Sequence, residues 1–298
     1  MPPVRTLLLA AAASLAFSAA AAAQPVNNTP STADVSKQRV FANIGLTNSE
    51  CIRYDEANDR YLISNLNTRG PENNGYITIM SPDGVVTNQK FIEGGKNGVT
   101  LIDPLGIYIR NGIIWVADIT HMRKFDLKTG KPLGEVALPG ANRPNDIYVT
   151  ADNTAYISDN GGASGTIIKV SPAGQVSLLQ PRDDIMEKPN GVAVMPDGSV
   201  VHGGRGVNIT FRDANTGALI REKTLPTGQF DALIPLPDGS ILAASQLGKN
   251  VYKVSPKGDI VEVAKEIAVP AAIGWDSKRN RLLIPQIAPG TITMVDLQ

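Results

Sequence analysis

Six short segments of the chain share one pattern, in which a turn precedes a partly apolar run. Their central residues fall at positions 50, 105, 145, 190, 231 and 271, so neighbouring segments are 40 to 55 residues apart. A period near 40 residues is typical of one supersecondary unit repeated along the chain. The central residues are Glu50, Leu105, Asn145, Asn190, Asp231 and Ala271.

The repeats also contain segments rich in β-branched and aromatic residues, which favour β-strands. Examples are residues 60–64, 113–117, 155–158 and 240–244, and similar runs such as 75–79, 166–170 and 251–254 follow them. Corners with Pro and Gly, such as Ser81-Pro82-Asp83-Gly84, separate the runs and suit type I or type II turns. Four strands in each of six units predict an all-β fold, a six-bladed β-propeller.

The two ends of the repeat array predict how the ring closes. The last unit ends with residues 291–296, which supply only its third strand, whereas residues 38–44 precede the first unit without belonging to it. We expect this amino-terminal strand to complete the last blade and to pair edges that would otherwise stay open. Residues 38–298 are therefore predicted to form a single propeller domain.

The first 23 residues have the pattern of an export signal. Arg5 supplies a positive charge, residues 7–17 supply an apolar core, and Ala21-Ala22-Ala23 resembles a cleavage site. The apolar stretch is short and rich in alanine for a bilayer crossing. We expect a periplasmic or secreted protein with no membrane insertion after cleavage, and a flexible linker over residues 24–37, which are rich in Asn, Thr, Ser and Pro.

The charge balance and the single cysteine exclude some classes of partner and of covalent cross-link. The chain has 28 basic and 28 acidic residues, a balance that argues against nucleic acid as a partner. The one cysteine, Cys51, forms no internal disulfide. Strand alternation places Cys51 opposite to Glu50 and between blades, where a thiol packs as a small hydrophobic group. The expected ligand is a small-molecule substrate.

The central residues of the repeats predict a site on the propeller axis. The residue that opens each inner strand points toward the axis at one mouth of the channel, so six such residues form a ring. Taken singly, Asn145 and Asn190 are readily explained as turn residues. Their shared register with two carboxylates favours a joint role. The two apolar positions, Leu105 and Ala271, are expected to form a wall for the substrate. The polar members of the ring are Glu50, Asn145, Asn190 and Asp231.

Two carboxylates and two amide oxygens form an oxygen-only ligand set for a divalent cation. Calcium fits best because it accepts roughly six to eight oxygens in irregular geometry. Another divalent cation, such as magnesium or manganese, is compatible with the same ligand types. Zinc is disfavoured because its sites use imidazole and thiolate, and the chain offers only His121, His202 and Cys51.

The residues around these positions resemble the family of senescence marker protein 30, gluconolactonases and related lactonases, and more distantly paraoxonase and diisopropyl fluorophosphatase. The resemblance covers the whole mature chain that would follow the export signal. It rests on Ser49-Glu50-Cys51-Ile52 at the first blade, Arg143-Pro144-Asn145-Asp146, Asn190-Gly191, and Asp231 at the start of a later inner strand. The family implies a six-bladed calcium propeller in which Glu50, Asn190 and Asp231 bind the metal. It also implies that Asn145 binds metal or substrate, and that Arg143 binds substrate hydroxyls or a carboxylate.

Together with calcium at the ring, the resemblance implies hydrolysis of a lactone or related ester. The metal would polarise the carbonyl, and a carboxylate would take a proton from the attacking water. Asp231 is the first candidate for this base and Glu50 the second. The loops that join second and third strands open on the same mouth, and they carry His121 and Arg205 as expected substrate contacts, with Arg69 nearby. The alternative is a non-catalytic, calcium-stabilised propeller that binds a small ligand or protein at this mouth.

Overall fold

The computed structural model describes residues 33–163, 165–179, 186–288 and 290–297. The predicted export signal lies outside the described residues, as does the linker up to residue 32. The rest of that linker contains the 3₁₀ helix η1 (Val35–Lys37), which Asp34 caps through the N–H of Ser36. Among the described residues, no helix is long and apolar enough to cross a bilayer.

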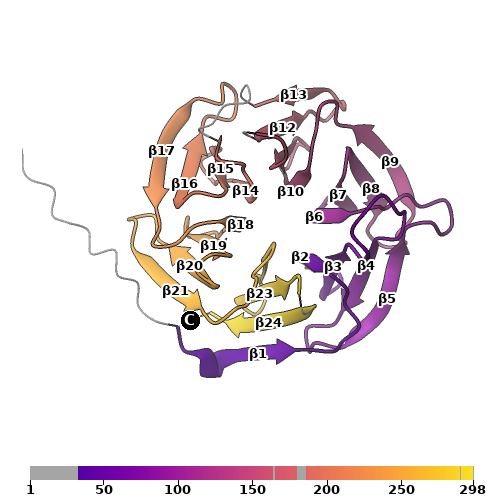
Figure 1. Cartoon of the computed structure of the whole chain (residues 1–298), viewed down its shortest axis with the longest axis horizontal. Helices are drawn as coiled ribbons and strands as arrows, with labels where there is room; N and C mark the ends of the chain where they lie inside the picture. Colours follow the sequence, from indigo (N-terminus) through magenta and orange to yellow (C-terminus); the bar gives the residue numbers. More distant parts are fainter. Residues whose placement is uncertain (1–32, 164, 180–185, 289, 298) are drawn as a thin grey trace, which may run out of the picture.

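Six four-stranded antiparallel sheets are arranged as a ring of blades around a central channel, which confirms the predicted propeller (Figure 1). Blade 1 contains β2 (Ser49–Asp55), β3 (Arg60–Asn65), β4 (Tyr76–Met80) and β5 (Val86–Glu93). Blade 2 contains β6 (Pro104–Arg110), β7 (Ile113–Asp118), β8 (His121–Asp126) and β9 (Pro132–Ala137). Blade 3 contains β10 (Pro144–Val149), β11 (Ala155–Asp159), β12 (Thr166–Val170) and β13 (Val176–Leu178).

The second half of the ring repeats this order. Blade 4 contains β14 (Val192–Val194), β15 (Val200–Gly203), β16 (Asn208–Arg212) and β17 (Leu219–Thr224). Blade 5 contains β18 (Phe230–Pro235), β19 (Ile241–Ser245), β20 (Asn250–Val254) and β21 (Ile260–Ala264). Blade 6 contains β22 (Gly274–Asp276), β23 (Arg281–Gln286), β24 (Thr291–Asp296) and β1 (Gln38–Phe41).

The ring closes as the sequence predicts. Strand β1 pairs with β24 along its whole length, from Gln38 opposite Val295 to Phe41 opposite Ile292. Blade 6 therefore contains both ends of the folded chain (Figure 1). This pairing satisfies backbone groups that two open edges would expose.

Burial decreases from the inner to the outer strands. The second strands β3, β7, β11, β19 and β23 are buried at almost every position, because both of their faces pack against neighbouring blades. The outermost strands β9 and β17 are mostly exposed. Between blades 1 and 2, the apolar contacts come from side chains such as Leu62, Ile77, Ile107 and Val116.

A β-bulge lies at the central residue of four inner strands. In blade 1, Ser49 pairs with Asn65 and Ile52 pairs with Ile63, so Glu50 and Cys51 lie opposite one residue of β3. Similar irregularities occur in β6, β10 and β18. A bulge re-aims side chains next to functional sites. Here it places Glu50 on the cavity at the channel mouth, while the buried Cys51 thiol contacts the backbone of Ile107 in blade 2.

Serine side chains tie two of these bulges, in blades 1 and 3, to the next blade. Ser64 accepts a hydrogen bond from the N–H of Cys51 (3.0 Å) and donates one to the carbonyl of Leu105 in blade 2 (2.7 Å). Ser158 accepts from the N–H of Asp146 (2.9 Å) and donates to the carbonyl of Asn190 in blade 4. These bonds fix the backbone of two ring residues, Leu105 and Asn190, relative to the preceding blade.

Polar residues at the ends of second strands hold the loops that lead into the inner strands. Asp159, the last residue of β11, accepts hydrogen bonds from the backbone N–H groups of Asn142 (3.0 Å) and Arg143 (2.6 Å). Corresponding contacts are made by Asn65, Asp118 and Gln286. This repeated contact fixes the residues just before Glu50, Leu105, Asn145 and Ala271.

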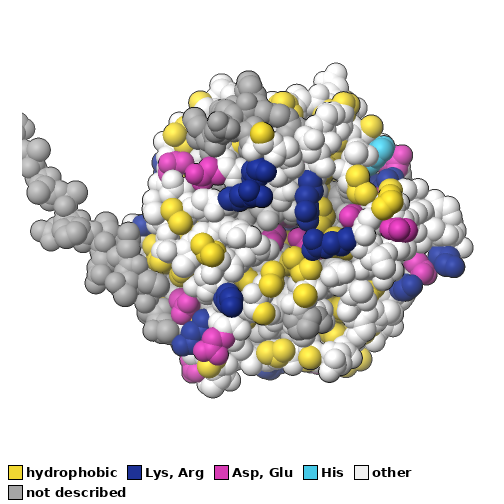
Figure 2. Space-filling model, viewed as in Figure 1, with side chains coloured by type: hydrophobic (Ala, Val, Ile, Leu, Met, Phe, Trp, Pro, Cys, Tyr) yellow, Lys and Arg dark blue, Asp and Glu magenta, His cyan; other side chains and the backbone are white. Residues whose placement is uncertain are grey.

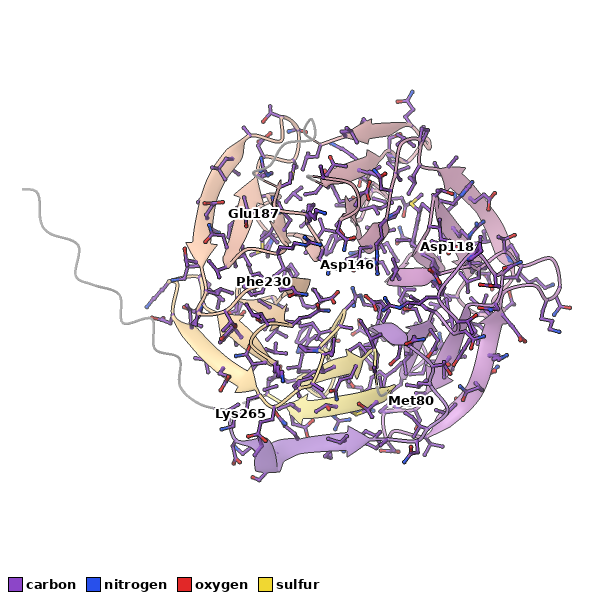
Figure 3. All side chains as sticks on the ribbon, viewed as in Figure 1. Met80, Asp118, Asp146, Glu187, Phe230 and Lys265 are labelled. Carbon is purple, nitrogen blue, oxygen red and sulfur yellow. The ribbon has the colours of Figure 1, made fainter. Side chains whose placement is uncertain are left out.

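A buried ion pair connects four blades across the channel. The guanidinium of Arg53 in β2 donates to the carboxylate of Asp146 in β10 (2.9 Å) and to the carbonyl of Ile273 in blade 6. Asp146 also accepts from the N–H groups of Ile147 (2.9 Å) and Val192 of blade 4 (3.4 Å). Asp146 lies near the centre of the ring in Figure 3. The pair therefore holds together blades 1, 3, 4 and 6.

The Arg53→Met substitution removes this guanidinium and leaves the buried carboxylate of Asp146 without its cation. We expect it to lower the free energy of unfolding by about 3 to 5 kcal/mol at pH 8, as measured by urea denaturation. The Lys90→Met substitution removes a partly exposed pair with Glu93 and should change stability by less than about 1 kcal/mol. Equal effects of the two substitutions would show that the channel pair does not hold the blades together.

Candidate metal and substrate site at the channel mouth

A cavity of about 420 Å³ opens at one mouth of the channel. In Figure 2, acidic side chains are visible inside the central hollow, and Lys and Arg side chains border it. All four polar ring residues line the cavity. Glu50, Asn145 and Asp231 are at most 2% exposed, and Asn190 is half-buried.

One side-chain oxygen of each polar ring residue is buried and has no hydrogen-bond partner among the described residues. Such oxygens are costly, because a buried acceptor normally finds a donor. Four of them at one cavity suit a cation that prefers oxygen ligands. In the described residues no group of three or more His, Cys, Asp or Glu gathers for a metal, and the ring at this cavity likewise combines only two carboxylates with two amides. The four atoms are Glu50 Oε2, Asn145 Oδ1, Asn190 Oδ1 and Asp231 Oδ1.

Burial strongly perturbs the carboxyl groups of the site. Desolvation raises the pKa of Glu50 to about 7. It also raises the pKa of Asp231 well above its ordinary value, and the nearby charge of Glu50 adds to this shift. Arg69 and Arg143 act in the opposite direction on both groups. A bound divalent cation would favour the ionised form of both carboxylates.

A chain of two glutamines orients Asp231. The side-chain amide of Gln246 donates to Asp231 Oδ2, and that of Gln229 donates to Gln246 Oε1 (2.7 Å). Gln229 itself has a left-handed backbone with φ of 61°. Neither glutamine was predicted from the sequence. These contacts engage Oδ2 only. Oδ1 of Asp231, which has no hydrogen-bond partner in the described part of the chain, therefore remains available to a ligand in the cavity.

A second set of cavity residues occurs at another fixed register, one residue after the end of the second strand. Its members in blades 3 to 6 are Asn160, Gly204, Gln246 and Ile287. This register was not predicted from the sequence, although an alignment of the ends of the second strands would reveal it. The loops after the second strands therefore supply the upper wall of the cavity.

The apolar part of the cavity differs from the prediction. Leu105 and Ala271 are buried, at 3% and 0% exposure, and do not line the cavity. The apolar lining comes instead from Val269 and Ile287 of blade 6. The side chains of Leu105 and Ala271 are packed inside the protein, so the apolar wall of the cavity comes from residues in the loops of blade 6.

Some of the predicted substrate contacts line the cavity in the structure, and one does not. Arg143 and Arg205 line the cavity, together with Arg69 and the unpredicted Lys188. His121 is not among the lining residues. It begins β8 in blade 2, where its Nδ1 lies 3.0 Å from Thr120 Oγ1 and its Nε2 lies 3.9 Å from Glu135 Oε1. The geometry therefore gives no support to a substrate contact by His121.

The structure has neighbours among solved propellers. A gluconolactonase from Xanthomonas campestris superposes with a TM-score of 0.67 at 18% identity, over 89% of this chain and 92% of that chain. A luciferin-regenerating enzyme gives 0.64 at 15%, covering 87% and 95%. The chain has the fold of the gluconolactonase-like propellers. The resemblance predicted from the sequence is confirmed at this level.

The same fold also includes lyases. A streptogramin B lyase superposes with a TM-score of 0.64 at 15% identity, over 88% of this chain and 98% of that chain. No protein-family model matches the sequence, and no curated protein matches it at the sequence level. At these identities the comparisons establish the fold, and the gluconolactonase-like chemistry has to be argued from the side chains of the cavity.

The second histidine, His202, belongs to the core of blade 4. It lies in β15, is 1% exposed, and accepts a hydrogen bond at Nε2 from Arg212 Nε (2.9 Å). Burial lowers the pKa of His202 to about 3, and the positive charge of Arg212 acts in the same direction. His202 is therefore neutral at ordinary pH in the folded protein.

The buried His202 predicts a loss of stability in mild acid. In the unfolded chain His202 binds a proton below about pH 6.5, whereas in the folded chain it stays neutral to about pH 3. It should therefore lower the free energy of unfolding by about 1.4 kcal/mol for each pH unit below 6.5. The His202→Gln variant keeps an acceptor for Arg212 and shares every other titrating group, so its urea denaturation at pH 7 and at about pH 5 isolates this contribution. The same pH slope in both proteins would contradict it.

Proposed function

We propose that this chain is an exported, calcium-dependent hydrolase of a lactone or related ester. The observation that carries the proposal is the set of four partnerless oxygens, from two carboxylates and two amides, at the base of one cavity. The gluconolactonase named among the structural neighbours supports the reaction class. The pattern of residues 1–23 supports export.

Glu50, Asn145, Asn190 and Asp231 fit a calcium ion by their chemistry. They offer hard oxygen atoms, and their two negative charges match one divalent cation. Bound there, the ion would polarise the substrate carbonyl and stabilise the negative charge that develops on its oxygen. Other divalent cations share this ligand preference, so calcium is proposed for its tolerance of an irregular ligand arrangement.

The remaining steps belong to the side chains of the cavity. Gln246 holds Asp231 through Oδ2, so the carboxylate has a fixed orientation when it takes the proton of the attacking water. Glu50 is the second candidate for this role. Arg143 would bind hydroxyl or carboxylate groups of the substrate, and Val269 and Ile287 would contact its carbon skeleton.

Two other functions are compatible with the fold. A neighbouring lyase from Staphylococcus aureus is described as catalytically inactive when one of its histidines is replaced by alanine. No histidine lines the cavity among the described residues of this chain, which favours hydrolysis by a carboxylate over that chemistry. The other alternative is a non-catalytic, calcium-stabilised propeller that binds a small ligand or protein at the same mouth.

The activity test is a panel of sugar and aliphatic lactones followed by pH-stat titration, with and without a calcium chelator. We expect turnover that the chelator abolishes and added calcium restores. The Asp231→Asn variant should lose at least about 100-fold in kcat, because it lacks the proton acceptor. The Asp83→Asn variant, which changes an exposed turn in blade 1, is the matched control.

The outcomes of this panel separate the hypotheses. Undiminished turnover by the Asp231→Asn variant would refute the role of Asp231 as the base. Calcium binding without turnover of any lactone would favour the non-catalytic propeller. Release of an unsaturated product, with no added water, would identify a lyase.

Calcium binding itself predicts opposite effects of one substitution on two states of the protein. The Glu50→Gln variant removes a buried carboxylate, so the metal-free protein should be more stable than the parent. The same variant should lose most of the stabilisation by calcium, which for the parent reaches about 2.7 kcal/mol at 100 times the dissociation constant. Thermal denaturation with and without calcium, together with calorimetric titration, measures both effects. An unchanged calcium affinity would remove Glu50 from the ligand set.

A further inference from the structure

The cavity carries more positive than negative charge. Four cationic side chains line it, whereas only two carboxylates, Glu50 and Asp231, do so. The whole chain is balanced, with 28 basic and 28 acidic residues, so the excess is a local property of this mouth. A divalent cation held by the carboxylates would increase the excess. The four cationic residues are Arg69, Arg143, Lys188 and Arg205.

The four cations have no ionic partner of their own in the described part of the chain. None of their side chains forms a salt bridge or a hydrogen bond there. Arg69 and Arg143 lie close enough to the buried carboxyl groups to lower the pKa of Glu50, of Asp231 and of Asp103, which lies nearby. These two arginines therefore compensate part of the acidic charge. Lys188 and Arg205, both on blade 4, remain as the surplus.

The backbone of blade 4 is built to bring Lys188 and Arg205 together. Glu187 and Lys188 both have left-handed backbones, with φ of 48° and 55°. The N–H of Arg205 donates to the carbonyl of Glu187 (2.9 Å). A Cβ on Gly204 would lie only 2.4 Å from the same carbonyl, so only glycine permits this approach. The left-handed backbone conformation is strained for residues other than glycine, and here two consecutive residues adopt it. Such strain clusters at ligand sites.

We infer that the substrate carries a negatively charged group in addition to its lactone, and that Lys188 and Arg205 bind this group. The inference rests on the proposed function, because it assumes that the lactone carbonyl lies at the ring of Glu50, Asn145, Asn190 and Asp231. A carboxylate or a phosphate ester on the sugar skeleton has the required chemistry, since both accept charge-assisted hydrogen bonds from Lys and Arg. Neutral sugar lactones would lack this contact.

The test compares sugar lactones that carry a neutral hydroxymethyl group, a carboxylate or a phosphate ester at the end of the sugar skeleton. D-gluconolactone is the neutral probe, D-glucarolactone carries a carboxylate, and 6-phospho-D-gluconolactone carries a phosphate. We expect kcat/KM for at least one anionic lactone to exceed that for the neutral lactone by about tenfold or more, as one hydrogen bond between charged groups contributes. The ratio should fall as salt is raised, because the contact is electrostatic and partly exposed. Whichever anionic lactone gives the higher ratio of kcat/KM to that of the neutral lactone shows whether the site prefers a carboxylate or a phosphate.

Substitutions then assign the contact. The double variant Lys188→Met with Arg205→Met should reduce the ratio of anionic to neutral kcat/KM by about tenfold or more. The Lys257→Met variant removes an exposed lysine that does not line the cavity and should leave the ratio unchanged. Thermal denaturation of each variant checks that blade 4 still folds.

Failure of this inference is distinguishable from failure of the proposed function. A ratio near one in the parent, or a ratio that the double variant does not change, overturns the inference while lactonase activity stands. If no lactone is turned over, the proposed function fails, and calorimetric titration of the open-chain acids in the presence of calcium decides the inference alone. D-glucarate binding at least about tenfold tighter than D-gluconate, with loss of that difference in the double variant, supports it. Equal binding overturns it.

Discussion

The burial of two carboxylates beside each other at the channel mouth is the constraint on which the rest of the site depends. Glu50 and Asp231 are almost fully enclosed, burial raises the pKa of both, and the charge of Glu50 makes the ionised form of Asp231 still less favourable. A fold pays for such a pair only where opposite charge is supplied nearby. Arginines at the mouth supply part of it, and the divalent cation that we propose would supply the rest.

The propeller keeps these groups in place through contacts that cross between blades. Ser64 and Ser158 connect the inner strand of one blade to the backbone of the next, and the pair of Arg53 and Asp146 spans the channel below. The ring positions of blades 2 and 4 therefore depend on contacts from the preceding blade. Since strand β1 closes the last blade, the ring cannot open at that point without loosening the geometry of the site.

The fold and the inner ring could be predicted because they depend on residues at a fixed period. Glu50, Asn145, Asn190 and Asp231 hold one register, and the structure brings all four to the same cavity. Lys188 could not be found in this way, because its position depends on loop conformation, including its own left-handed backbone. Gln246 belongs to a second fixed register, one residue after the second strand, which was not aligned. His121 was expected at the mouth because it follows a second strand, whereas in the structure it lies 3.9 Å from Glu135 of its own blade and is not among the cavity residues.

The chemical character of the cavity wall changes from blade 4 to blade 6. Blade 4 contributes Lys188 and Arg205, blade 5 contributes Asp231 with its two glutamines, and blade 6 contributes Val269 and Ile287. These blades are consecutive in the ring (Figure 1). A ligand across them would meet positive charge, then the candidate base, then an apolar surface. Such a sequence of environments favours a single orientation of an asymmetric substrate, because reversing the ligand would place its charged group against the apolar wall.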